Sequence, residues 1–285
     1  MTWLSIVLVG IGVGDVIRST SWPPGRLVGH VAAPVVILAV ALLAGMHTWA
    51  DLLALAVAAA AGAGWAELSR RTQMTGRDAL APLAVFAAIV VGLLAFSGAA
   101  SRPAGALASW LGWADLPGGS LSVTRVLLLA GLVLFNVATA NIIVRLVLLA
   151  IGALRPSDVT NANVAAAALA AAAAATAVPA GGAPPPPPGQ PADRLKGGRL
   201  LGPMERLVIL GLGIVGQFGA AGLVIAAKGL LRFPEIQAAA RTASGDPASA
   251  AYAGGPAGID DVTEYFLVGS FVSWLIALGS LALTA

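Results

Sequence analysis

Residues 197–236 read GGRLLGPMERLVILGLGIVGQFGAAGLVIAAKGLLRFPEI, and the interpretation of the whole chain starts from this stretch. It is apolar over a membrane length, yet it carries the polar side chains of Glu205, Arg206, Gln217 and Lys228. The last three are spaced by eleven and eleven residues, close to three turns of an α-helix, so they fall on one stripe. The pattern predicts one membrane-spanning helix whose polar stripe faces other helices.

The composition of the chain places it in the membrane class. Of its 285 residues 58% are hydrophobic and 10% are charged, and the mean hydropathy is +0.90. Soluble domains carry about 25% charged residues, so the sequence predicts an all-α integral membrane protein with the lipid bilayer as its surroundings. The chain has no cysteine, which excludes disulfides and thiolate metal sites. Its net charge of +3 comes from short arginine-bearing loops, so we expect no nucleic-acid partner. The wealth of alanine, glycine and arginine is typical of a GC-rich bacterial genome.

Seven apolar segments are expected to cross the membrane. A cleaved signal peptide is the alternative for the first, because that segment is short, although no basic residue precedes it. We expect an N-terminal part, residues 1–154, with five spans, a linker at 155–196, and a C-terminal part, 197–285, with two spans. Asp51 is expected to cap the third helix, with Thr48 as the alternative cap. The spans are residues 3–17, 27–44, 49–68, 79–96, 121–154, 207–227 and 261–285.

Two of these segments are unusual. The fifth exceeds the roughly 20 residues that a crossing needs, which predicts a tilted helix or one that projects into water. The linker contains an alanine run at residues 164–178 and five consecutive prolines at 184–188, which favour extended polyproline II. We expect a disordered, water-exposed linker between helices five and six. In the alternative, the alanine run inserts and reverses the orientation of all that follows.

The distribution of lysine and arginine predicts the orientation. The side with more of them is expected to be cytoplasmic, which places the N-terminus outside and the C-terminus inside a bacterial cytoplasmic membrane. Arg145 lies within a span. The richer side holds Arg18, Arg26, Arg70, Arg71, Arg77, Arg155, Arg194, Lys196, Arg199 and Arg206, and the other holds Arg102, Arg125, Lys228, Arg232 and Arg241.

Two groups of polar residues are candidates for a site. Asp15, His30 and Glu67 lie on the first three spans and are a candidate ion or proton site, since ionisable residues inside membranes are commonly functional. The alternative is that they lie near span ends, within reach of water. The second group is expected to lock the last three spans together, with Gln217 bonded to Asn136 or Asn141 and Lys228 extending to the interface. It comprises Asn136, Asn141, Arg145, Glu205, Arg206, Gln217, Lys228 and Glu264.

The C-terminal part carries three motifs: GRLLGPMERL from Gly198, GQFGAAGLVIAAKGLLRF from Gly216 and TEYFLVGS from Thr263. In these motifs the chain resembles the bacterial membrane family catalogued as domain of unknown function 3307. The resemblance implies an N-terminal part with His-x-x-x-Asp pairs, which suit a metal or proton site. Here the carboxylates of Asp15 and Glu67 remain, but the residues four positions earlier are Ile11 and Ala63.

No catalytic motif is found in the sequence. The glycines of residues 211–222 follow no strand and precede no Lys-Ser/Thr pair, so they do not indicate a phosphate-binding loop. We expect a non-enzymatic assembly or partner-docking component without a cofactor, which reaches a cytosolic protein through its proline-rich linker. The first alternative is a transporter of small solutes or ions that uses intramembrane carboxylates. The second is a degenerate metal-dependent membrane hydrolase.

Overall fold

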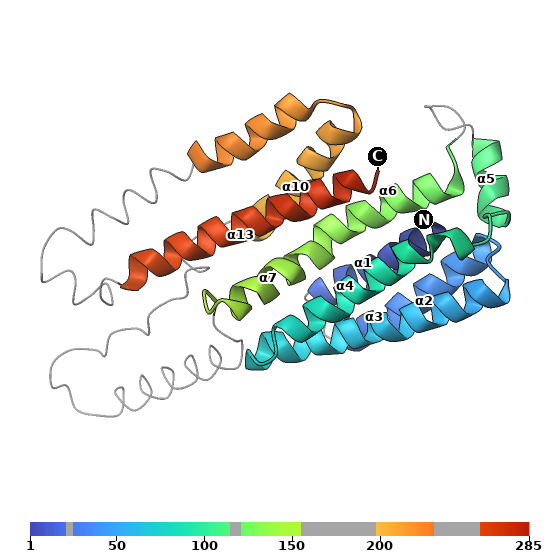
Figure 1. Cartoon of the computed structure of the whole chain (residues 1–285), viewed down its shortest axis with the longest axis horizontal. Helices are drawn as coiled ribbons and strands as arrows, with labels where there is room; N and C mark the ends of the chain where they lie inside the picture. Colours follow the sequence, from blue (N-terminus) through green and yellow to red (C-terminus); the bar gives the residue numbers. More distant parts are fainter. Residues whose placement is uncertain (21–24, 115–120, 155–197, 231–256, 285) are drawn as a thin grey trace, which may run out of the picture.

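The protein is a bundle of roughly parallel and antiparallel helices, seen in a computed structural model (Figure 1). The structure describes residues 1–20, 25–114, 121–154, 198–230 and 257–284. Within these ranges every regular element is a helix, which confirms the all-α class. The alanine run and the proline run of the linker lie outside the described residues. Among the described residues, four helical segments are long and apolar enough to cross a membrane: Thr2–Ser19, Trp49–Thr75, Val123–Ala150 and Tyr265–Ala282.

Helix α1 (Thr2–Ser19) lies at the centre of the N-terminal part. Its side chains Trp3, Ile6 and Ile11 are at most 3% exposed because α2, α3 and α6 surround them. Small residues allow the close packing. A Cβ at Gly131 of α6 would lie 2.9 Å from the Cβ of Leu8 and 3.2 Å from the main chain of α1. The first expected span is therefore a core helix of the fold.

The next three helices wrap one side of α1. They are α2 (Gly25–Leu43), α3 (Trp49–Thr75) and α4 (Leu80–Ala95), and two of them, α2 and α4, are shorter apolar helices. Aromatic rings connect this side to the rest, since Phe86 of α4 packs 5.0 Å from Trp65 and 5.7 Å from Phe135, centroid to centroid. After α4 and a short 3₁₀ turn (Ser97–Ala99), α5 (Ala106–Ala114) lies across the end of the bundle (Figure 1). Its Trp110 and Trp113 are 50% and 82% exposed, as expected for residues at a membrane interface.

The fifth expected span is one helix with a wide turn at its middle. It consists of α6 (Val123–Leu134), a π-helical turn η2 (Phe135–Thr139) and α7 (Ala140–Ala150). These 28 residues account for its excess length. π turns inside α-helices are commonly found at functional sites, and nothing in the residue pattern predicted this one.

The sixth expected span is wrong as a single helix. Helix α10 (Gly198–Ile214) ends at a turn in which Gly216 has φ +77°, and a second helix, Phe218–Leu230, runs back beside it (Figure 1). We call these two helices and their turn the hairpin. Its legs pack on each other and on α13 (Ala257–Ala282) through Ile209, Ala221 and Ala277. In Figure 1 the N-terminus and the C-terminus lie toward the same end of the bundle.

Candidate functional site: two buried polar clusters

The guanidinium of Arg206 is the centre of the first polar cluster, where three segments meet. It is 1% exposed and donates from Nε and Nη2 to the carbonyl of Asn136, at 3.0 and 2.7 Å. Nη2 also reaches Oδ1 of Asn141 at 2.5 Å, and Nη1 reaches Oγ of Ser273 at 2.9 Å. These acceptors belong to η2, α7 and α13, so one side chain of α10 joins all of them. We call Arg206, Asn136, Asn141, Ser273 and Ser280 the arginine clamp.

The π turn supplies the main acceptor of the clamp. In η2 the N–H of Ala140 bonds to the carbonyl of Phe135, five residues back, so the regular ladder of α-helical bonds is interrupted there. The carbonyl of Asn136 lies in this turn and accepts two bonds from Arg206. A side chain inserted into the ladder is a recognised cause of such distortions. The π turn therefore leaves a carbonyl available to the buried guanidinium, and the guanidinium satisfies that carbonyl.

Helix α13 carries a row of buried hydroxyl groups, two of which, those of Ser273 and Ser280, belong to the clamp. Ser270, Ser273 and Ser280 are each at most 5% exposed. The side-chain amide of Asn136 donates to Oγ of Ser280 at 2.9 Å and to the carbonyl of Leu132 at 2.8 Å. Sequence analysis missed these serines. They are spaced by three and seven residues, which puts them on one helical face. This spacing is the signal that could have found them.

Beside the clamp, Lys228 pairs with Glu205. Their Nζ and Oε2 atoms are 2.5 Å apart, and both side chains are 17% exposed. Lys228 therefore does not simply extend to the interface. Gln217 does not bond Asn136 or Asn141 either, because it lies exposed at the turn of the hairpin.

Two further members of the predicted second group are Arg145 and Glu264. Arg145 is exposed on α7, and the side chain of Glu264 lies outside the described residues.

The second cluster surrounds Asp15 of α1. This carboxyl group is 1% exposed, accepts a hydrogen bond from Nε1 of Trp65 at 3.3 Å and is paired with Arg18 one turn further along. The alternative that Asp15 lies within reach of water does not hold for this carboxyl group, which its neighbours bury. Its burial follows from the central place of α1, which the sequence did not reveal.

His30 and Glu67 do come together, as the candidate site required, with Nε2 and Oε2 3.6 Å apart. Glu67 is engaged mainly by its own helix, since Arg70 Nη2 lies at 2.8 Å and Arg71 Nε at 2.6 Å. Asp15 is joined instead to Trp65 and Arg18, so the three predicted residues form a pair and a separate buried carboxylate. Across the residues that the structure describes, no three His, Cys, Asp or Glu side chains are grouped closely enough to hold a metal ion.

Asp51 is a second buried carboxylate, at the end of α3 opposite Glu67. Thr48 is the N-cap, and Asp51 completes a capping box with it, so both residues take the capping role that the sequence offered to one of them. Asp51 also accepts from Trp3 Nε1 at 2.7 Å and from the main-chain N and the hydroxyl of Ser101 at 3.2 and 2.6 Å. It thereby ties α1, α3 and the segment after α4 together.

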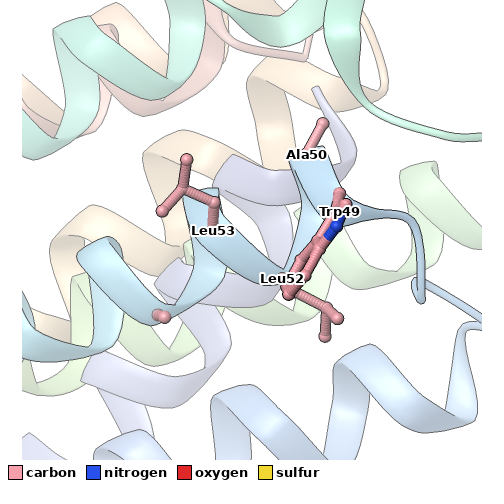
Figure 2. Close-up of a pocket in the computed structure, with 5 residues that line it drawn as sticks. Trp49, Ala50, Leu52 and Leu53 are labelled. Carbon is pink, nitrogen blue, oxygen red and sulfur yellow. The ribbon is translucent and has the colours of Figure 1, made fainter.

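An apolar hollow lies near Asp51 on the outer side of α3. Figure 2 shows it lined by Trp49, Ala50, Leu52 and Leu53, with Ala56 completing the lining. All five residues come from one helix, and Trp49 is 85% exposed, so the hollow is open to the surroundings of the bundle. Its chemistry fits acyl chains of lipid better than a polar solute.

Comparisons of the chain with protein-family models, with curated proteins and with solved structures found no match.

Proposed function

We propose that this chain is a multi-pass protein of the bacterial cytoplasmic membrane that acts without catalysis, as an assembly or partner-docking component. The arginine clamp is the observation that carries the proposal. Arg206 is fully buried, and its bonds go to acceptors of the protein itself, on three other segments. A polar group that served a transported solute would face a path for that solute. The clamp instead holds α10 against α6–η2–α7 and α13.

The proline run is the feature that favours docking. Residues 184–188 follow the N-terminal part in the sequence, and polyproline II segments are preformed ligands for aromatic grooves. The resemblance to domain of unknown function 3307 is part of the proposal and adds no activity to it. In this assignment the helical bundle holds the linker at the membrane surface, and the linker binds a cytosolic protein.

A cross-linking experiment tests this assignment. Because the chain has no cysteine, Gly189→Cys and Gly112→Cys each carry a single thiol, the first beside the prolines and the second on α5. We expect a discrete product with a cytosolic protein from Gly189→Cys alone, which disappears when residues 184–188 are replaced by serine. Equal products from both positions, or none from Gly189→Cys, would contradict docking.

A transporter is the second candidate, and the buried Asp15 is what favours it. A carboxylate that is 1% exposed inside an apolar bundle is a common element of ion and proton paths. Its contacts with Trp65 and Arg18 are the structural alternative. Flux of protons or monovalent cations into proteoliposomes that is lost in Asp15→Asn, but retained in the matched surface variant Asp78→Asn, would replace docking by transport.

The degenerate hydrolase is the weakest of the three candidates. In the described ranges the ligands that such an enzyme needs are not grouped, and the pair His30 and Glu67 is bound up with two arginines.

A further inference from the structure

We infer that residues 198–230 are a re-entrant hairpin that enters and leaves the membrane on the arginine-rich face. In this topology α10 descends into the bilayer and the helix Phe218–Leu230 returns to the face from which α10 came. The inference goes beyond the proposed function and rests only on the location of the bundle in a membrane.

The turn at Gly216 is a helix-ending motif and not a loose kink. The N–H of Gln217 bonds to the carbonyl of Leu212 at 2.8 Å, and the N–H of Gly216 bonds to that of Gly213 at 3.0 Å. With Gly216 at φ +77°, this is the Schellman arrangement that satisfies the last carbonyls of a helix. Backbone groups at membrane depth must be bonded within the protein, and the motif does this for the end of α10.

The pair Glu205 and Lys228 shows that the two legs run side by side. In one continuous helix the 23 residues between them would separate their main chains by about 35 Å, at about 1.5 Å per residue. Their charged atoms are 2.5 Å apart. The two side chains also neutralise each other at the base of the hairpin, where each would otherwise be an isolated charge.

The returning leg is the shorter of the two. It contains 13 residues, against 17 in α10 and 16 in α4, whereas a crossing needs about 20. The side chain of Leu281 fills the space beside Gly213, and Ser280 bonds to Asn136. Asn136 stands at the middle of the 28-residue helix Val123–Ala150. The turn at Gly216 follows shortly after Gly213, so it lies level with the last turn of α13 and close to the middle of the helix Val123–Ala150.

The distribution of charge supports the same topology. If residues 198–230 crossed the membrane, Lys228, Arg232 and Arg241 would lie on the arginine-poor face, against the usual bias. A re-entrant hairpin returns all three to the arginine-rich face. With Arg145 and the buried Arg206 set aside, that face then holds twelve lysines and arginines and the opposite face holds two, Arg102 and Arg125.

One consequence differs from the orientation expected from the sequence. After a re-entrant hairpin, α13 starts from the arginine-rich face and runs toward the opposite one. The C-terminus then points outward, like the N-terminus, and not inward. The position of both termini toward one end of the bundle in Figure 1 fits this arrangement.

Single cysteines test the topology, because the chain has none of its own. Leu201→Cys and Leu230→Cys place a thiol on each leg at positions 46% and 75% exposed. Arg77→Cys marks the arginine-rich face, and Gly112→Cys marks the opposite face. Right-side-out and inside-out vesicles are treated with a membrane-impermeant maleimide. We expect the thiols at 201 and 230 to react in the same vesicles as that at 77.

Reaction at 230 in the same vesicles as 112 would overturn the inference, because it would place the two legs on opposite faces. Reaction of 77 and 112 in the same vesicles would overturn it too, by removing the membrane crossings on which it rests. Neither result depends on whether residue 189 cross-links to a partner, so failure of the hairpin and failure of the proposed function are distinguishable.

A charge exchange tests the hairpin when a thiol on a leg does not react. We expect Glu205→Lys and Lys228→Glu each to lower the Tm of the detergent-solubilised chain, and the double exchange to recover at least half of the loss. Additive losses in the double variant would overturn the side-by-side arrangement of the legs.

Discussion

Arg206 donates two hydrogen bonds to the main-chain carbonyl of Asn136, which lies 70 residues earlier in the sequence and within a π-helical turn. Substitution of Asn136 would not remove its main-chain carbonyl, so the contribution of these bonds to stability is tested by substitution of Arg206. The bond joins the C-terminal part to the N-terminal part across the linker. Substitutions in the arginine clamp therefore test whether the two parts form one structure.

Arg206→Leu should lower the stability by about 2 kcal/mol or more, because it leaves the acceptors of Asn136, Asn141 and Ser273 buried without their donor. Arg206→Lys should recover only part of the loss, since an ammonium lacks the planar fork that reaches three acceptors. Gln217→Leu is the matched control and should cost less than about 0.5 kcal/mol, because Gln217 is exposed. Thermal unfolding in detergent, followed by size-exclusion chromatography, measures all three. A loss in Gln217→Leu as large as in Arg206→Leu would contradict the clamp.

Gly131→Ala should separate α1 from α6. Its added methyl group would meet the main chain of α1 at 3.2 Å, and a main chain cannot yield as the end of a side chain can. We expect a loss of about 1–3 kcal/mol, the usual cost of overpacking. Gly92→Ala on α4 is the control, since a Cβ there meets nothing within 4 Å, and it should be neutral or slightly stabilising. Equal melting temperatures for the two variants would show that α1 and α6 are not in contact.

Asp51→Asn should destabilise the end of the bundle that carries α5. The carboxylate accepts hydrogen bonds from Trp3, Thr48 and Ser101. The NH₂ group of an asparagine would face at least one of these donors and could not accept from it. We expect a loss of about 1–3 kcal/mol. Asp78→Asn is the control, because Asp78 is exposed at φ 53°, a conformation that asparagine adopts readily. Protease sensitivity of the segment near Ser101 should rise in Asp51→Asn alone.

Metal content separates the docking proposal from the hydrolase alternative. The purified chain should hold no stoichiometric metal that depends on Asp15 and Glu67. Elemental analysis of the wild type and of the double variant Asp15→Asn, Glu67→Gln measures this. One equivalent of metal in the wild type, lost in the variant, would contradict the docking proposal and make His30 the next residue to replace.

The hairpin could be predicted from the sequence only in part. The eleven-residue spacing on both sides of Gln217 suggested a single stripe, but the same spacing is symmetric about a turn at Gln217. Both interpretations place Arg206 and Lys228 equally far from that residue. The deciding feature is Gly216 with its positive φ, and this glycine could not be told apart from the other glycines of the stretch, which serve in helices.

The polar clusters could be predicted only in part. Sequence reasoning selected Arg206, Asn136 and Asn141, because charged and amide groups in an apolar stretch need partners. It paired Asn136 or Asn141 with Gln217 and not with Arg206, since pairing depends on the relative depth of helices that are far apart in the sequence. A carbonyl that becomes available only in a π turn cannot be read from residue types. The burial of Asp15 likewise depends on where α1 lies in the bundle.

The central place of α1 has a consequence for the synthesis of the protein. Thr2 bonds to Thr124 at 3.0 Å, 122 residues later, so α1 packs against a helix that is made long after it. At about 5–20 residues per second, α1 waits on the order of 10 s for α6. During that interval Asp15 and Arg18 have each other one turn apart, so the helix carries its own charge partner into the lipid before its neighbours exist. The pair of Asp15 and Arg18 therefore has a use during insertion of α1, before the final packing of the bundle exists.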